Sequence, residues 1–299
     1  MRPAALAAVC LAAVSGCATA GGARPPPPAE PATTLRFAWP DGFQARVTLV
    51  HREQRPDAPP ASARASHRLV AERRGNAIRV SVRDVEAAGD VPDLEMNVRI
   101  SEALVQVVAQ DGTYLRTEGL DEALAILGAE EGEERGVSRR ALERIAELDW
   151  ELTAGGWAGR ALEPGRPSTR QFPGSVPLLP GVPALLDVEQ SLLAPAPCEE
   201  GGAASECVAL SWRGTPTAAA RAEALRRLRG EGGAGEGTAL EDLDGRVEAR
   251  LIAEPATLVP HRLDVEEELR IRVRHAGGDA VELVERSEDH YRFVTEQEL

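Results

Sequence analysis

The chain has 299 residues, of which 43% are hydrophobic and 27% are charged, the balance of a folded globular protein rather than a disordered one. Its formal net charge of −14 argues against binding to nucleic acid, whose phosphate backbone needs a basic surface. Aromatic residues make up only 3% of the chain, too few to suggest the stacking platforms that bind carbohydrate or single strands.

The chain begins with one positive charge, Arg2, followed by an almost unbroken run of alanine, leucine and valine. This run is shorter than the about 20 apolar residues that cross a bilayer, and it ends in small residues, as secretory signals do. Residues 1–16 are therefore predicted to be a signal peptide that is removed. An ordinary signal peptide, with Cys10 and Cys17 present by chance, is the alternative interpretation.

Val14-Ser15-Gly16-Cys17 resembles the lipobox of bacterial lipoproteins, in which an aliphatic residue and two small residues precede a cysteine. The resemblance implies cleavage before Cys17, a diacylglycerol thioether on its sulfur, and acylation of the new amino terminus, for example with palmitate. Several acyl chains hold a protein on a membrane far better than one chain does. By the same analogy, Ala18 in place of an aspartate implies sorting to the outer membrane, with the domain facing the periplasm.

Residues 17–34 read as a tether, because four consecutive prolines among alanine and glycine favour an extended polyproline segment. The remaining residues, 35–299, are predicted to form a single β-rich globular domain.

Apolar and polar residues alternate with a period of two through the first part of this domain, the pattern of strands that bury one face. The pattern predicts strands within Phe43–Leu49, Ile78–Val82, Leu94–Ile100, Leu104–Val108 and Thr113–Thr117, with turns at 74–76 and 110–112.

The middle of the chain changes to helical spacing. Asp121 is expected to cap a short helix that ends at Gly128, and Ser138 to cap a second helix that Gly155-Gly156 stops. Residues 160–197 are rich in proline and are expected to be irregular. A third helix is predicted over Thr217–Arg229.

The last part of the domain returns to strands, over Val247–Ala253, Leu263–Val273 and the residues from Ala280 onward. Glu267 falls on the apolar side of the second of these strands, which conflicts with full burial of that side. Strands, then helices, then strands indicate an α+β fold: a curved antiparallel β-sheet, or half-barrel, with helices packed on its concave face.

The lipobox, the tether and a curved sheet that holds helices together resemble the lipoprotein-carrier superfamily of bacterial envelopes, the half-barrel LolA and LolB type. For residues 35–299 the resemblance is architectural and rests on no diagnostic motif, and a shared fold is weak evidence for a shared function.

Cys198 and Cys207 bracket a polar loop that contains glycine, and in an exported protein such a pair indicates a disulfide. A metal site there would need more soft ligands close by in the sequence, and no histidine lies between Arg170 and Pro260. We therefore predict a disulfide and no metal or cofactor.

The remaining residues show no recognisable catalytic pattern. His51 and His67 are expected to be exposed strand residues, although they could face each other across a hairpin. Gly230, Gly232 and Gly235 match a dinucleotide fingerprint but follow a helix instead of a strand, which favours a linker. Four arginines of the third predicted helix, from Arg221 to Arg229, form a local basic face, which is either a solvated helix face or a surface for a partner. A catalytic pair of carboxylates would be hidden among the many acidic residues.

An apolar stretch, residues 177–186, is interrupted by prolines. It is either a flap that packs over the open side of the sheet and adds to the core, or a mobile lid that lines a cavity for a lipidic ligand or dips into the bilayer. The residues of the candidate ligand-binding lid are Leu178, Leu179, Val182, Leu185 and Leu186.

These features predict a non-enzymatic cell-envelope lipoprotein, anchored to the membrane through its lipid, whose domain binds an apolar ligand or an envelope protein partner. A structural or assembly scaffold without a ligand cavity is the first alternative. A hydrolase is the second, and clustered buried carboxylates would favour it.

Overall fold

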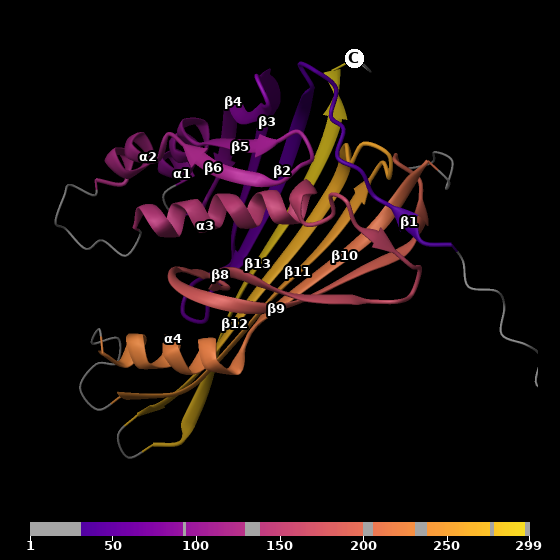
Figure 1. The fold of residues 1–299 in the computed structure, drawn as a ribbon. Helices are drawn as coiled ribbons and strands as arrows, with labels where there is room; N and C mark the ends of the chain where they lie inside the picture. The colour runs from indigo at the N-terminus through magenta and orange to yellow at the C-terminus, as the bar shows by residue number, and fades with distance from the viewer. Residues whose placement is uncertain are drawn as a thin grey trace, which may run out of the picture. The chain divides into compact units, whose positions relative to one another are not determined.

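We describe a computed structural model that covers residues 31–91, 94–128, 138–199, 206–230, 238–275 and 278–296. Eleven antiparallel strands form one open sheet in the order β6-β5-β4-β3-β2-β13-β12-β11-β10-β9-β8 (Figure 1). The strands are β2 (Gln44–Gln54), β3 (Ala61–Arg74), β4 (Ala77–Gly89), β5 (Val105–Ala109), β6 (Tyr114–Glu118), β8 (Ser168–Val176), β9 (Leu179–Ala196), β10 (Cys207–Pro216), β11 (Thr238–Ala253), β12 (Pro260–His275) and β13 (Ala280–Thr295).

Alternation along the strands gives this sheet an apolar and a polar face. The register places Leu210, Leu251 and Leu263 side by side on three neighbouring strands, all of them buried. We call this face the core face and the opposite one the outer face. On the outer face arginines and carboxylates pair across the strands, as Arg213 does with Glu248 at 3.0 Å. The expected α+β fold with an antiparallel sheet is therefore present.

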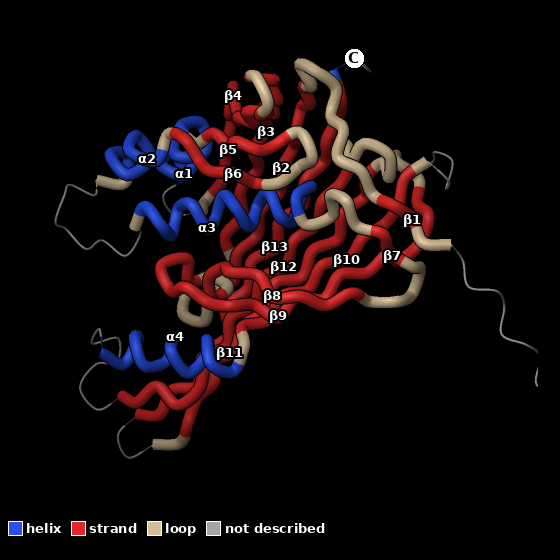
Figure 2. Tube along the Cα trace, viewed as in Figure 1, coloured by secondary structure: helices blue, strands red, loops and turns tan. Residues whose placement is uncertain are grey.

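Four α-helices accompany the sheet in the described part of the chain (Figure 2). The helix α3 contacts β5 and β6 near one edge of the sheet and β8 and β9 at the other, while the π-helical turn η1 that continues it contacts β11 and β12. None of the helices in the described residues is long and apolar enough to cross a membrane. The helices are α1 (Leu94–Ala103), α2 (Leu120–Ile126), α3 (Arg139–Trp150) and α4 (Ala218–Gly230), and η1 covers Glu151–Gly155.

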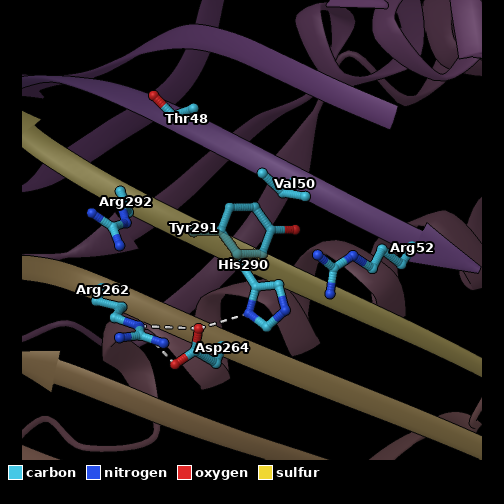
Figure 3. A pocket seen from close by; sticks show the side chains of 8 residues that line it. All are labelled: Thr48, Val50, Arg52, Arg262, Asp264, His290, Tyr291 and Arg292. Atoms are coloured by element: carbon cyan, nitrogen blue, oxygen red, sulfur yellow. Dashed lines mark hydrogen bonds and ion pairs between the residues drawn. The ribbon is translucent and has the colours of Figure 1, made fainter. Parts of the chain in front are cut away.

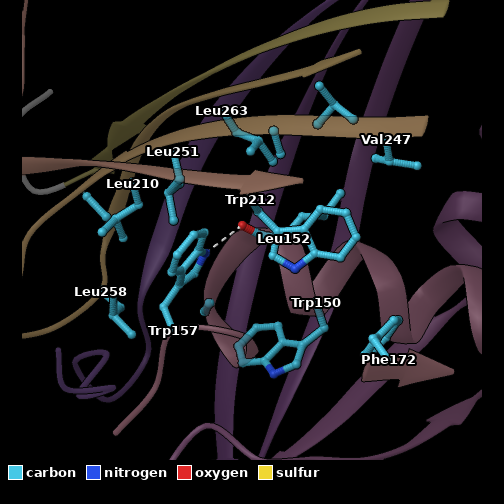
Figure 4. Close-up of a cluster of buried hydrophobic side chains, with 14 of the residues drawn as sticks. Trp150, Leu152, Trp157, Phe172, Leu210, Trp212, Val247, Leu251, Leu258 and Leu263 are labelled. Carbon is cyan, nitrogen blue, oxygen red and sulfur yellow. Dashed lines mark hydrogen bonds between the residues drawn. The ribbon is translucent and has the colours of Figure 1, made fainter. Parts of the chain in front are cut away.

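Tryptophans fill the centre of the main hydrophobic cluster (Figure 4). Trp150, Trp157 and Trp212 are each at most 2% exposed. The indole nitrogen of Trp150 donates to the carbonyl of Gly112 at 2.8 Å, and that of Trp157 donates to the carbonyl of Leu152 at 3.1 Å. Because these indole donors have partners, the large side chains are buried without losing a hydrogen bond.

The amino-terminal segment of the described chain is part of this core. The strand β1 (Thr33–Thr34), which covers the last two residues of the predicted tether, pairs with β7 (Ala161–Leu162). Leu35, Phe37 and Trp39 then follow as buried residues. Backbone hydrogen bonds join 35 to 160, 36 to 255 and 38 to 257, so the segment is held by two separate parts of the chain.

A polar network is buried beside η1. Arg170 forms an ion pair with Glu151, whose carboxylate also accepts a hydrogen bond from the indole nitrogen of Trp212 at 3.2 Å. Gln190, fully buried, accepts a hydrogen bond from Arg170 at 3.3 Å and donates to the carbonyl of Gly156 at 2.8 Å. A Cβ atom at Gly156 would lie 2.4 Å from Glu151 Oε1, which explains the glycine.

Most of the predicted elements are present, with two exceptions. Residues 94–100, predicted as a strand, lie in α1 instead. Leu94, Val98 and their neighbours alternate, but Ile100 and Ala103 also follow Met96 at helical spacing, and both pack against the small apolar cluster that contains α2 residues. This contact with α2 favours the helical period over the strand period.

The second exception is the proline-rich segment 160–197, expected to be irregular, which contains β7, β8 and the long strand β9. Pro173 lies in β8, the edge strand, and Pro177 lies in the turn that follows. Proline lacks an amide donor and is tolerated at a sheet edge and in turns, so these positions do not prevent pairing.

The Ser138 cap and the disulfide are confirmed, but the predicted Asp121 cap is wrong: α2 begins at Leu120, its N-cap is Gly119 with no side-chain hydrogen bond, and Asp121 lies in the first turn of the helix. Ser138 Oγ accepts a hydrogen bond from the amide of Ala141 at 3.2 Å, at the start of α3. Cys198 and Cys207 form a disulfide, with their Cα atoms 5.1 Å apart. The lipobox with Cys17 and most of the predicted tether lie outside the described residues, as does most of the glycine fingerprint, 231–237.

Candidate functional site

The five predicted lid residues belong to the β8–β9 hairpin and fall into different environments. Leu186 is fully buried in the core, whereas Leu185 is 40% exposed. Leu178, Leu179 and Val182 are partly buried and pack against the main cluster. The stretch is therefore a paired hairpin rather than an irregular loop, and part of it contributes to the core.

The tip of this hairpin lies across the core face of the sheet. A Cβ atom at Gly245 of β11 would lie 3.0 Å from Pro177 Cδ, so the absence of a side chain there makes room for the turn. Leu178 has a positive φ of 59°, which is uncommon for a branched residue. Its amide donates a hydrogen bond to the carboxylate of Glu267 on β12. That bond supplies a reason for the unusual backbone conformation.

Glu267 belongs to a group of ionisable side chains under the hairpin tip, on three neighbouring strands. The register pairs His51 of β2 with Asp289 of β13, and Glu267 with Ser287, two residues before Asp289 on the same face. His51 Nδ1 and Asp289 Oδ1 are 2.7 Å apart, and each of the two side chains is 24% exposed. The hydrogen bond with Asp289 is the main cause of a raised pKa at His51.

Asp149, in the last turn of α3, completes the group from the helical side. The residue as a whole is exposed, yet the loss of hydration at its carboxyl group, followed by the charge of Asp289, raises its pKa to about 7. Burial, followed by the charges of Asp289 and Asp149, also raises the pKa of Glu267 to about 7. We call Asp149, Glu267, Asp289 and His51 the carboxylate cluster.

The carboxylate cluster holds more negative charge than its surroundings stabilise. Burial and nearby like charges disfavour ionisation, so the pKa values of Asp149 and Glu267 both lie at about 7. Tyr291, two residues from Asp289 on the same face, has its pKa raised by burial and by the same carboxylates. This arrangement can accept and release protons, and it favours a positively charged or hydrogen-bond-donating group. Carboxylate and imidazole are also common metal ligands, but their proximity alone does not make a metal site.

The outer face carries a depression of about 320 Å³ over β2, β13 and β12 (Figure 3). Its cationic side chains are already compensated. Arg262 donates to Asp264 at 3.1 Å, His290 Nδ1 lies 2.9 Å from the same carboxylate, and Arg52 lies 3.7 Å from Glu288. We therefore do not assign an anion site to it. The lining residues are Thr48, Val50, Arg52, Arg262, Asp264, His290, Tyr291 and Arg292.

The arginines of α4 are paired in the same way. Arg221 lies 2.9 Å from Asp244, Arg227 lies 3.0 Å from Glu223, and Arg229 donates to the backbone carbonyl of Leu240 at 2.8 Å. These contacts agree with the interpretation of a solvated helix face.

No protein-family model matches the chain, and no curated protein matches it significantly. The candidate site therefore rests on the geometry alone.

Sequence reasoning found only part of the carboxylate cluster. It singled out Glu267 as a charged residue on the apolar side of a strand, and Glu267 does belong to the carboxylate cluster. It expected His51 and His67 to be exposed, but both are half-buried on the core face, where burial lowers the pKa of His67 to about 4. Asp149 and Asp289 gave no signal, because each looks like an ordinary acidic residue until the fold brings them together.

Proposed function

We propose that this protein is a lipid-anchored cell-envelope protein that acts by binding an apolar ligand or a protein partner rather than by catalysis. In this proposal the sheet is a half-barrel of the LolA and LolB type with helices on its concave face, and the anchor places it at the outer membrane facing the periplasm. The observation that carries it is the β8–β9 hairpin tip, whose partly buried Leu178 and Leu179 lie over the core face.

The hairpin tip suggests how such a ligand would bind. Leu178, Leu179 and Val182 are not fully buried, so lifting the tip costs less than extracting a core residue and would expose apolar surface beside the carboxylate cluster. An amphipathic ligand with an apolar part and a cationic or hydrogen-bond-donating group suits that combination. The scaffold alternative is supported by the three buried tryptophans, Trp150, Trp157 and Trp212, which belong to the main hydrophobic cluster.

The anchor is tested by replacing Cys17. We expect the wild-type chain to incorporate radiolabelled palmitate and to accumulate as a heavier precursor when cells are treated with globomycin. The Cys17→Ser variant should show neither behaviour, and Cys10→Ser, which changes a residue of the discarded leader, should behave as wild type. Equal masses with and without globomycin, and no label in any chain, would show an ordinary secreted protein.

Ligand binding is tested on the mature domain by native mass spectrometry after incubation with an envelope lipid extract. We expect lipid adducts on the wild type and fewer on Leu178→Asn, because asparagine tolerates a positive φ but removes the apolar surface. Leu185→Asn is the matched control, since Leu185 is in the same hairpin but exposed. The scaffold alternative predicts adducts on none of the three proteins.

The carboxylate cluster favours a second candidate, an acid–base hydrolase. Two carboxyl groups that titrate near neutral pH are suited to general acid and general base roles. A panel of chromogenic ester, phosphate and glycoside substrates tests this. Turnover that follows a bell-shaped pH profile and is abolished in both Asp149→Asn and Glu267→Gln would replace the binding proposal.

A further inference from the structure

At one end of the sheet, residues with metal-binding side chains converge from four consecutive strands. Cys198 follows β9, Cys207 opens β10, and His261 is the second residue of β12. The two sulfur atoms and one ring nitrogen of His261 lie within 4.8 Å of one another. Glu254 directly follows β11, and its Oε1 atom lies 3.5 Å from His261 Nε2. The hydrogen-bonding register, not the local sequence, brings Cys198, Cys207 and His261 together, and Glu254 joins them through its contact with His261.

The burial of the His261 side chain also points to a bound ligand. The side chain is only 9% exposed, and its buried Nε2 atom makes no hydrogen bond of acceptable geometry with the described residues, although Glu254 Oε1 lies 3.5 Å away. Buried polar atoms are nearly always satisfied, and an exception calls for an explanation such as an ion. A ring nitrogen beside two sulfurs and a carboxylate is placed as a metal ligand would be.

We propose that Cys198, Cys207, His261 and Glu254 bind one Zn²⁺ ion when the disulfide is reduced. Zn²⁺ prefers four ligands in a tetrahedron, drawn from thiolate, imidazole and carboxylate. The disulfide and the metal site are alternative states of the same cysteine pair, because sulfurs bonded to each other cannot both act as thiolate ligands.

The conversion of the disulfide into the zinc site takes two steps, in which electrons and protons balance. A dithiol reductant gives two electrons and two protons to the Cys198–Cys207 bond, which breaks to two thiols while the reductant becomes a disulfide. Zn²⁺ then binds the two sulfurs with release of their two protons. The site therefore belongs to a folded chain in a reducing environment. A disulfide oxidant that takes two electrons from the two thiolates re-forms the Cys198–Cys207 bond and releases the ion.

The backbone around the four residues is rigid in a way that suits a metal site. A tight turn from Glu254 to Val259 is closed by two backbone hydrogen bonds, Glu254 amide to Val259 carbonyl at 3.1 Å and Leu258 amide to Glu254 carbonyl at 2.8 Å. The hydroxyl of Thr257 donates to Glu254 Oε2 at 2.5 Å and orients the carboxylate. Hydrogen-bonded partners of this kind orient metal ligands.

Co²⁺, a coloured stand-in for Zn²⁺, tests the proposal on the full chain carrying Cys10→Ser and Cys17→Ser, so that only the bridge cysteines remain. After reduction with a phosphine, we expect titration with Co²⁺ to give a thiolate-to-metal charge-transfer band and tetrahedral d–d bands that saturate at one ion per chain. Zn²⁺ should displace the colour. The oxidised chain should give no such bands.

The ligand assignment is tested with His261→Ala and Glu254→Gln, which should weaken Co²⁺ binding by at least about 10-fold. His275→Ala, at the other end of β12, is the matched control and should bind as the parent chain does. Circular dichroism of each oxidised variant checks that the fold is intact. An absence of charge-transfer bands in the reduced chain, or equal affinity in a folded His261→Ala, would overturn the proposal. Neither the lipid anchor nor the carboxylate cluster enters this test.

Discussion

Replacing Arg170 with alanine should lower the free energy of unfolding by about 3–5 kcal/mol, because it leaves the Glu151 carboxylate buried without its cation. The side chains of Arg170 and Glu151 are 22% and 9% exposed, so water compensates the lost ion pair poorly. Glu151 keeps its hydrogen bond from Trp212, but that donor is neutral. Urea denaturation followed by tryptophan fluorescence measures the change.

The control for this prediction is Arg166→Ala. Arg166 pairs with Glu163 at 3.1 Å, but both side chains are well exposed, and such pairs contribute about 0–1 kcal/mol. Adding Glu151→Gln to Arg170→Ala should recover part of the loss, since glutamine is neutral and can still accept from Trp212. The prediction fails if Arg170→Ala costs no more than Arg166→Ala.

The variant Glu267→Gln should stabilise the protein at pH 8 while changing its stability little at pH 4.5. Burial and the neighbouring carboxylates raise the pKa of Glu267 from 4.5 to about 7 in the folded protein. The folded state therefore holds the proton more tightly than the unfolded state does. Its contribution is complete below pH 4.5 and is lost as the pH rises through 7, a loss of up to about 3 kcal/mol. Glutamine cannot ionise, so the variant does not lose this stability as the pH rises.

Other groups of the core face titrate in the same range, so the difference between variant and wild type is the quantity to measure. His67, with its pKa lowered to about 4, makes the protein more stable as the pH rises toward 6.5, the opposite sign. His51, with its pKa raised, adds stability that is lost above its folded pKa. Both are present in wild type and variant. Replacement of Asp149 with asparagine should act in the same direction as Glu267→Gln.

Guanidinium denaturation at closely spaced pH values from 4.5 to 8.5 measures this difference. Glu266→Gln serves as the control, because Glu266 is the exposed neighbour of Glu267 in the chain and lies on the outer face. A stability difference for Glu267→Gln that stays constant from pH 4.5 to 8.5 would show that folding does not raise the pKa of Glu267, and it would contradict the prediction.

The strands could be predicted where the spacing of the apolar residues fits a strand but not a helix. In β12, Leu263, Val265 and Leu269 keep to one face over a long stretch, so no helical spacing competes with the strand pattern. In α1 the residues from Leu94 to Ala103 fit both the strand period and the helical period. Contacts with α2 favour the helix, and these contacts cannot be read from the sequence of α1 alone. In β8 and β9 the prolines concealed strands, because their effect depends on whether the stretch that contains them has partner strands on both sides. Pro173 lies in the edge strand β8, and in β9 Pro183 pairs only with β8 and Pro195 only with β10.

The candidate sites were harder to predict because their contacts are distant in sequence. His51 and its partner Asp289 are 238 residues apart, so no local spacing relates them. The disulfide was predictable from the short separation of its cysteines. The approach of His261 to that bridge was not, because it depends on the pairing of β10, β11 and β12. Glu267 was recognisable alone, as a charge in an apolar stripe, but its carboxylate neighbours were not.

The way in which the chain enters the domain has a mechanical consequence. Leu35, Phe37 and Trp39 are buried, and backbone hydrogen bonds hold this segment on both sides. If Cys17 is fixed in a lipid layer, a force that pulls the body away from the membrane reaches these residues before it reaches the sheet. The segment therefore acts as a clamp that bears load, and single-molecule stretching from the amino terminus should show it yielding at a higher force in wild type than in Trp39→Ala.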